Sequence, residues 1–103
     1  MALSKKIQHS NGTETSYHKI HEVTLIHESD IIGTSVIDTG YEFAIKVYSY
    51  VSQELRAVSE HNYVKSTTVY GNKPADMVEE TNVMSIAYQI VLEDPRFAGA
   101  EPI

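Results

Sequence analysis

A strict alternation of side chains in the middle of the sequence constrains the fold most. Between Tyr41 and Val51, apolar or aromatic side chains occupy every second position except Ser49, with Phe43, Ile45 and Val47 at the centre. A period of two residues is that of a β-strand, whose successive side chains point to opposite faces. We therefore predict a strand here with one buried face and one face open to solvent or to a partner.

Further segments have the β-branched and aromatic composition of strands, and Asn, Asp, Gly or Pro follow each of them. Strands are predicted at residues 5–9, 16–27, 31–37 and 62–70, with turns or strand ends at 11–12, 28–30, 38–40 and 71–74. Within residues 16–27, Ile20 and Ile26 share one parity whereas Val23 and Leu25 share the other, which indicates a bulge or two buried faces. Residues 52–62 fit a single helical turn or a long loop, and we favour the loop.

The period changes after Pro74 from that of a strand to that of a helix. Apolar residues then recur at helical spacing on one face: Val83, Ile86, Ala87, Ile90 and Val91. Thr81 or Asn82 is a suitable N-cap, and Pro95 ends the helix. We predict one amphipathic helix, with Glu79 and Glu80 at its positive dipole end.

These elements predict an α+β fold, in which a small antiparallel sheet of four or five strands is covered by one C-terminal amphipathic helix. A chain of 103 residues has material for one domain, which we place at residues 1–94. Residues 95–103 form a C-terminal tail that docks or is flexible. Because one helix covers only part of such a sheet, the remaining surface must be polar, capped or given to another subunit.

Charge and composition exclude several classes of function. A net charge of −6 offers no basic footprint for phosphates, so nucleic-acid binding is not expected. No apolar run reaches the 18 or so residues of a membrane span, and the start has no signal-peptide pattern, so we expect synthesis in a cytoplasm and no membrane partner. The absence of Cys removes disulfides, thiolate metal sites and a cysteine nucleophile.

No residue pattern points to catalysis. His18, His21 and His27 crowd one segment, but on a flat strand His18 and His21 face opposite ways, and His21 and His27 share a face about 20 Å apart. A metal-dependent enzyme or a pH switch built on them is therefore a minor alternative to hydrogen-bonded strand histidines. No Gly-x-Ser-x-Gly elbow or glycine-rich phosphate loop occurs. We predict no catalytic, cofactor-binding or metal-ligating residue, and hence not an enzyme.

Tyrosine is the unusual part of the composition, with seven Tyr and no Trp. Tyr48 and Tyr50 have the parity opposite to Phe43, so they face outward if Phe43 faces the helix. Such tyrosines cover a sheet edge, fill a second small core or form a partner surface, for which Tyr is suited because it supplies contact area at low entropic cost. We predict an interface that contains Tyr48, Tyr50, Tyr63, Tyr70 and Phe97.

Several segments, taken in order, resemble a family of small proteins that tailed phages and prophages of Gram-positive bacteria encode among their tail and baseplate genes. The segments that carry the resemblance are residues 1–7, Asn11-Gly12, Tyr17-His18-Lys19-Ile20, Val47-Tyr48-Ser49-Tyr50 followed by residues 52–56, Ala87-Tyr88, and Phe97-Ala98-Gly99-Ala100. Residues 30–40 match poorly. The resemblance implies a component of the virion or of its assembly, and the family brings no catalytic or cofactor residue.

We therefore expect a non-catalytic structural protein of a tailed-phage virion, associated with the tail or baseplate. It would be made in the host bacterial cytoplasm and end in the virion. Its expected partners are other phage structural proteins and further copies of itself, in a homo-oligomer or symmetric array. The alternative is an adsorption accessory in which Tyr48 and Tyr50, with Tyr63 or Tyr70, form a stacking platform for a saccharide.

Overall fold

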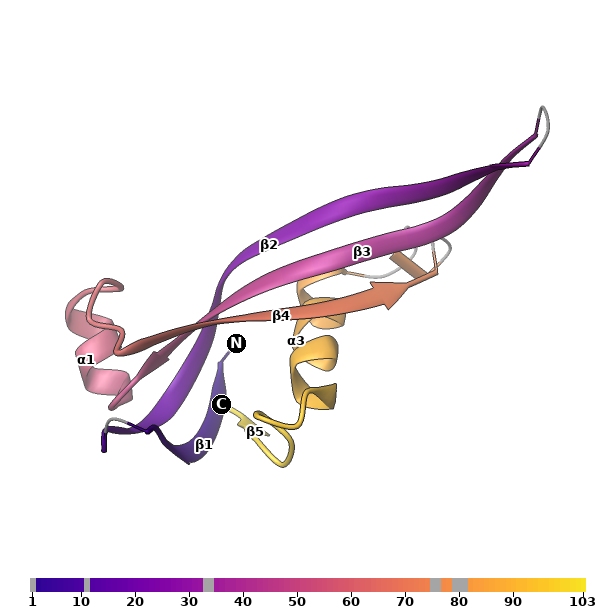
Figure 1. The fold of residues 1–103 in the computed structure, drawn as a ribbon. Coiled ribbons are helices and arrows are strands. Elements are labelled where there is room, and N and C mark those ends of the chain that lie inside the picture. Colours follow the sequence, from indigo (N-terminus) through magenta and orange to yellow (C-terminus); the bar gives the residue numbers. More distant parts are fainter. Residues whose placement is uncertain (1, 11, 33–34, 75–76, 79–81) are drawn as a thin grey trace.

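The structure is a computed structural model that describes residues 2–10, 12–32, 35–74, 77–78 and 82–103 (Figure 1). The elements are β1 (Leu3–Gln8), β2 (Glu14–Ile32), β3 (Ser35–Tyr50), α1 (Gln53–Val58), β4 (Lys65–Lys73), α3 (Val83–Glu93) and β5 (Glu101–Pro102). The five strands form one sheet in the order β4-β3-β2-β1-β5, and every neighbouring pair is antiparallel. The predicted α+β class and small antiparallel sheet are confirmed.

Strands β2 and β3 form one long hairpin, which corrects three sequence predictions. The turn predicted at residues 28–30 lies inside β2, and the strand predicted at 31–37 is split between β2 and β3. The strand end predicted at 38–40 is a bulge: Glu28 pairs with Gly40 and Ser29 with Asp38, so β3 has one extra residue. Gly40 has a φ of 103°, which a glycine adopts without the steric cost of a Cβ. The turn-like residues thus disturb the strand without ending it.

The predicted bulge in β2 is confirmed. Ile20 pairs with Val47 and Glu22 with Lys46, so His21 is the extra residue between them. This insertion moves the side chains after it to the other parity. As a result, Ile20 and Val23 both lie on the face that packs into the core.

The hairpin extends well beyond the other strands. We call residues 28–32 and 35–40 the arm and the rest of the described chain the main body; the arm begins where β3 has passed the last residue that it pairs with β4, Tyr41. Figure 1 shows the two strands of the arm running away from the rest of the sheet. The molecule measures 54 × 27 × 24 Å and has a radius of gyration of 16.0 Å, against about 13 Å for a compact chain of about 100 residues. The arm makes the chain elongated.

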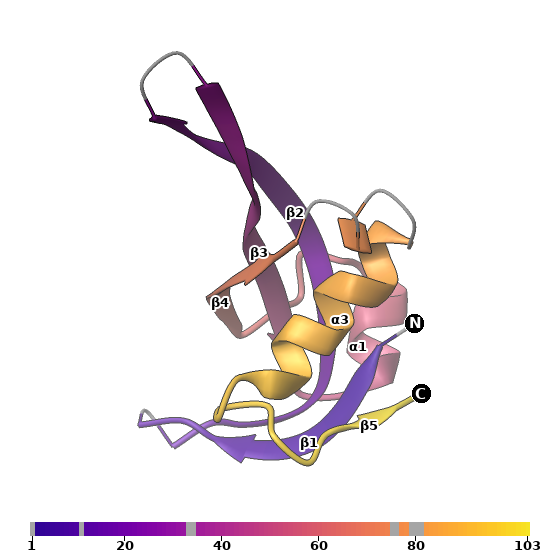
Figure 2. The same ribbon diagram turned by 90° about the vertical axis from the view of Figure 1, so that its right-hand side faces the viewer.

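Helix α3 lies against one face of the sheet, which we call the inner face (Figure 2). Its buried residues Ile86, Ala87, Ile90 and Val91 share one hydrophobic core with sheet residues such as Phe43. Contact with β4 is close, because a Cβ on Gly71 would lie 2.6 Å from Ile90 Cγ2. The side chain of Asn82 accepts hydrogen bonds from the Met84 and Ser85 amides, so the predicted N-cap at Asn82 is confirmed. The predictions for Glu79, Glu80 and Thr81 lie outside the described residues.

A short helix replaces the loop favoured for residues 52–62. Helix α1 begins after Ser52, whose side chain accepts a hydrogen bond from the Leu55 amide, and none of its residues is buried. At the other end, Asn62 Nδ2 donates to the Leu55 carbonyl at 3.0 Å. Side-chain caps therefore support this helix in place of burial.

The tail at residues 95–103 docks on the chain's own domain. Strand β5 pairs with β1, with Pro102 opposite Leu3. The Lys5 ammonium donates to the Ala98 carbonyl at 2.7 Å. Phe97 is only 2% exposed and belongs to the main core. The tail completes the fold.

Candidate functional site

His18, the first histidine of the histidine-rich segment, is a buried residue whose hydrogen bonds join neighbouring strands. His18 is fully buried on the inner face, and both ring nitrogens are bonded at 2.8 Å, Nδ1 to Ser49 Oγ and Nε2 to the Lys5 carbonyl. A carbonyl only accepts, so Nε2 carries the proton and Nδ1 accepts from the Ser49 hydroxyl. Burial holds the pKa of His18 below its usual 6.5, against an opposing effect of the Lys5 carbonyl and with smaller help from the charges of His9 and Lys5. The neutral ring links β1, β2 and β3.

The other two histidines of the segment lie on different faces, so the prediction that His21 and His27 share a face is wrong. The bulge at His21 is the cause, because it changes the parity between them. His21 stacks on Tyr48 with ring centroids 4.1 Å apart, and His27 stacks on Tyr41 at 4.7 Å. Among the described residues, no group of three or more His, Asp or Glu side chains could hold a metal ion.

Tyr48 and Tyr50 lie on the outer face, opposite the helix, but neither presents a free ring. Tyr48 is stacked between His21 on one side and Tyr63 on the other, the latter at 3.8 Å. Tyr50 is 1% exposed, contacts Tyr17 edge to face, and donates its hydroxyl to the Glu60 carbonyl at 2.6 Å. Both faces of Tyr48 are therefore occupied by the chain's own rings. These residues stabilise the outer face where α1 meets the sheet.

Tyr70 and Phe97 are the remaining residues of the predicted interface, and only Tyr70 is exposed. Tyr70 is 68% exposed on the outer face of β4, where it is available to a partner. Phe97 contacts the ring of His18 in the core at a centroid distance of 5.4 Å. It is therefore part of no surface of the folded chain. Its apolar character in a C-terminal segment indicated docking, but the docking surface is the chain's own.

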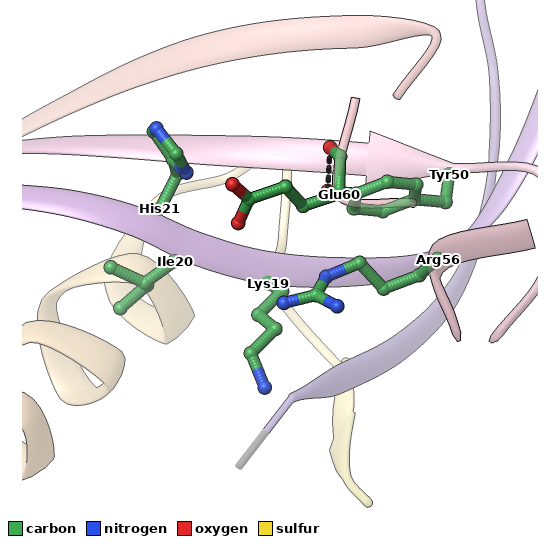
Figure 3. Close-up of a pocket in the computed structure, with 6 residues that line it drawn as sticks. All are labelled: Lys19, Ile20, His21, Tyr50, Arg56 and Glu60. Atoms are coloured by element: carbon green, nitrogen blue, oxygen red, sulfur yellow. Dashed lines mark hydrogen bonds between the residues drawn. The ribbon is translucent and has the colours of Figure 1, made fainter. Parts of the chain in front are cut away.

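A small pocket lies beside the stacked rings (Figure 3). Lys19, Arg56 and Glu60 bring charges to it from β2, from α1 and from the segment after α1, and Ile20, His21 and Tyr50 complete the lining. Its volume is about 10 Å³, room for a single water molecule. A saccharide ring or a cofactor does not fit there.

Two long stretches of strand edge lack a strand partner among the described residues. From residue 20 to residue 32, β2 has no strand on the side away from β3 within the described part of the chain. The amide of Ile20 turns to that side and donates to the hydroxyl of Tyr88 at 3.4 Å. At the other end of the sheet, β4 pairs only with β3 among the described strands. Unpaired strand edges are templates for pairing with another chain.

Apolar side chains accompany both edges on the outer face. Ile26 of β2 is 51% exposed, and Tyr70 occupies the corresponding face of β4. A hollow of about 320 Å³ lies against the β2 edge, between Lys19 and Ile20 on the strand and Met84 and Tyr88 on α3. The sequence did not predict the β2 edge, because the expected turn at 28–30 divided β2 into two short strands.

Comparison with protein-family models, curated proteins and solved structures finds no match to this chain. Within the described residues, no helix is long and apolar enough to cross a membrane.

Proposed function

We propose that this chain is a non-catalytic structural component of a tailed-phage virion, associated with the tail or baseplate, which acts through protein–protein contacts. The resemblance to small phage tail and baseplate proteins supports the proposal, and so does the shape of the molecule. His18 is engaged in hydrogen bonds, and His21, Tyr48 and Tyr63 in ring stacks, that hold the fold together. The exposed faces and edges of the sheet therefore remain available for contacts with other proteins.

The arm is the observation that carries the proposal. It holds two paired strands away from the main body, and the outer edge of β2 lacks a strand partner among the described residues. Soluble monomers normally shorten, charge or cover such edges. A long uncovered edge fits a chain whose sheet continues into a neighbouring subunit. In this proposal, helix α3 covers only the inner face of the main body. The arm then contacts other subunits of an assembly.

The saccharide-binding alternative has less support. A stacking platform needs an aromatic face open to the sugar, whereas Tyr48 is enclosed between two rings and Tyr50 is buried. Tyr70 is exposed without a second ring beside it in the described contacts.

The proposal is tested on particles of the phage or prophage that encodes the chain. Mass spectrometry of density-purified virions should detect the chain, in a copy number that matches the symmetry of the tail or baseplate. Its absence from mature particles and from isolated tails would contradict the proposal. A gene carrying Tyr70→Lys should give fewer complete tails by electron microscopy, whereas Val58→Lys, on the exposed surface of α1, should give normal particles.

A further inference from the structure

Two tyrosine rings lie stacked on the outer face of the sheet. The ring centroids of Tyr48 and Tyr63 are 3.8 Å apart, and the ring planes are 22° from parallel. At this separation the ring carbons of one residue are in van der Waals contact with those of the other. Tyr48 lies near the end of β3, and Tyr63 lies between α1 and β4. Two phenols from different segments are thus held face to face.

The backbone around Tyr63 is fixed to β3 on both sides of that residue. Val64 donates its amide to the Ser49 carbonyl at 2.8 Å. On the other side, the Glu60 carbonyl accepts from the Tyr50 hydroxyl at 2.6 Å. These hydrogen bonds keep the two stacked rings together in the folded chain. Holding two groups in contact greatly raises the rate of a reaction between them.

The composition directs one-electron oxidation to tyrosine. The chain contains neither Cys nor Trp, which compete with tyrosine for one-electron oxidants, and its three Met are oxidised by oxygen transfer to the sulfoxide. Tyr63 is 38% exposed, so an oxidant in solution reaches the pair. Loss of solvent and then the neighbouring hydroxyl of Tyr63 hold the pKa of Tyr48 above its usual 10, so this phenol is protonated at neutral pH. Its oxidation therefore releases a proton as well as an electron.

We propose that Tyr48 and Tyr63 form a modification site, at which a one-electron oxidant joins the two rings in an intrachain dityrosine. A haem peroxidase with hydrogen peroxide is an oxidant of this class. Each phenol gives one electron to the oxidant and one proton to water, which leaves two tyrosyl radicals with unpaired spin at the ring carbons beside the C–O bond. One such carbon of each ring forms the new carbon–carbon bond, and the hydrogens at those carbons move to the phenolic oxygens. The chain loses two hydrogen atoms, and the peroxide is reduced to water.

The cross-link would be a covalent staple in a chain that can make no disulfide. It would join β3 to the segment before β4 and close a loop that contains α1, a helix with no buried residue. A cross-link of this kind restricts the unfolded chain and so favours the folded one. The inference goes beyond the proposed function and does not depend on it, because it rests on the geometry of a single chain.

Peroxidase treatment of the full chain tests the inference. The protein is treated at low concentration with a haem peroxidase and hydrogen peroxide, and the fraction that stays monomeric under denaturing conditions is isolated. Mass spectrometry of its digest should find peptides joined through Tyr48 and Tyr63 with the loss of two hydrogen atoms. Tyr63→Phe keeps an aromatic ring in the stack but removes the phenol, so it should reduce the dityrosine fluorescence of the monomer by about tenfold or more.

Two other tyrosines supply matched controls. Tyr17 contacts Tyr50 edge to face at 6.0 Å, and Tyr50 is only 1% exposed. Tyr17→Phe should therefore leave the dityrosine yield of the monomer unchanged. Tyr70 is 68% exposed, so Tyr70→Phe should lower only the cross-linking between chains. A monomer without dityrosine, or one whose fluorescence falls as far in Tyr17→Phe as in Tyr63→Phe, would overturn the inference.

Urea unfolding of the oxidised monomer is a second measurement. The cross-linked chain should unfold at a higher urea concentration than the untreated chain, because the new bond joins rings that are already in contact in the folded state. Tyr63→Phe carried through the same oxidation should show no such rise, which separates the cross-link from other oxidative damage. A cross-linked chain that unfolds at a lower urea concentration would mean that the rings joined only after the stack had opened, and would also overturn the inference.

Discussion

His18 is neutral in the folded chain because burial lowers its pKa, and its two nitrogens contact groups that a neutral ring can satisfy. One nitrogen accepts from the Ser49 hydroxyl and the other donates to the Lys5 carbonyl, within a site closed by Phe97. A second proton, on Nδ1, would donate to the Ser49 oxygen only if the Ser49 hydroxyl pointed its own hydrogen away from Nδ1. The Lys5 carbonyl on its own would favour a protonated ring, so burial is the main reason that His18 is neutral.

This arrangement predicts a loss of stability in weak acid. The pKa of His18 is lowered in the folded chain, whereas in the unfolded chain it is near 6.5. The contribution of His18 is fully present above about pH 6.5 and is lost as the pH falls below it, because the unfolded chain then takes up a proton that the folded chain resists. Urea unfolding between about pH 7.5 and pH 5.5 should show a smaller decline in the free energy of unfolding for His18→Gln than for the natural chain. Identical declines in the two proteins would refute this role, and His61→Gln on the surface is the control.

At the scale of elements, local patterns predicted what depends on neighbouring residues in the sequence. Alternation located the strand at Tyr41 to Val51, the parity of Ile20 and Val23 indicated a bulge, and helical spacing with Asn82 located α3. Glycine and aspartate at 38–40 gave a false signal, because they favour a bulge as readily as a turn.

The outer face shows why the candidate site was only half predicted. Parity placed Tyr48 on the outer face, which the structure also shows. The sequence could not reveal that a bulged His21 and a Tyr63 from the segment after α1 would occupy the two faces of its ring. Contacts between distant segments depend on the register of the whole sheet, and one inserted residue changes them.

The bulge in β3 gives a second prediction. A Cβ on Gly40 would lie 2.5 Å from the Lys73 carbonyl oxygen, at a φ that L-residues avoid. We expect Gly40→Ala to reduce the free energy of unfolding by about 2 to 3 kcal/mol, the sum of backbone strain and displacement of β4. Gly12→Ala has similar strain with no atom near the new Cβ, and should cost about 1 kcal/mol. Chemical denaturation measures both, and equal losses would argue against the close approach of Gly40 to β4.

The docked tail gives a third prediction. Phe97 is buried beside His18, so Phe97→Ala should cost about 3 to 5 kcal/mol of stability. Ile103→Ala changes an exposed side chain and keeps the backbone hydrogen bonds between residues 2 and 103, so it should cost less than about 0.5 kcal/mol. Thermal or urea unfolding distinguishes the two. A stable Phe97→Ala protein would mean that the tail is dispensable for folding.

The whole molecule is elongated because the arm has no counterpart at the other end of the sheet. Small-angle scattering of a dilute, monomeric sample should therefore give a radius of gyration close to the 16.0 Å of the structure. A value near the roughly 13 Å of a compact chain would mean that the arm folds back on the main body.

The pairing of β5 with β1 bears on the order in which the chain folds. The β2–β3 hairpin joins residues that are close in sequence, so its closure costs little entropy and it can form early. Leu3 meets Pro102 only when both ends of the sequence are available. During synthesis, β1 pairs with β2 before β5 is available, so its outer edge has no strand partner until the last residues leave the ribosome. An unpaired strand edge is open to aggregation in that interval, and the final step of folding covers the β1 edge at Leu3 and Ser4.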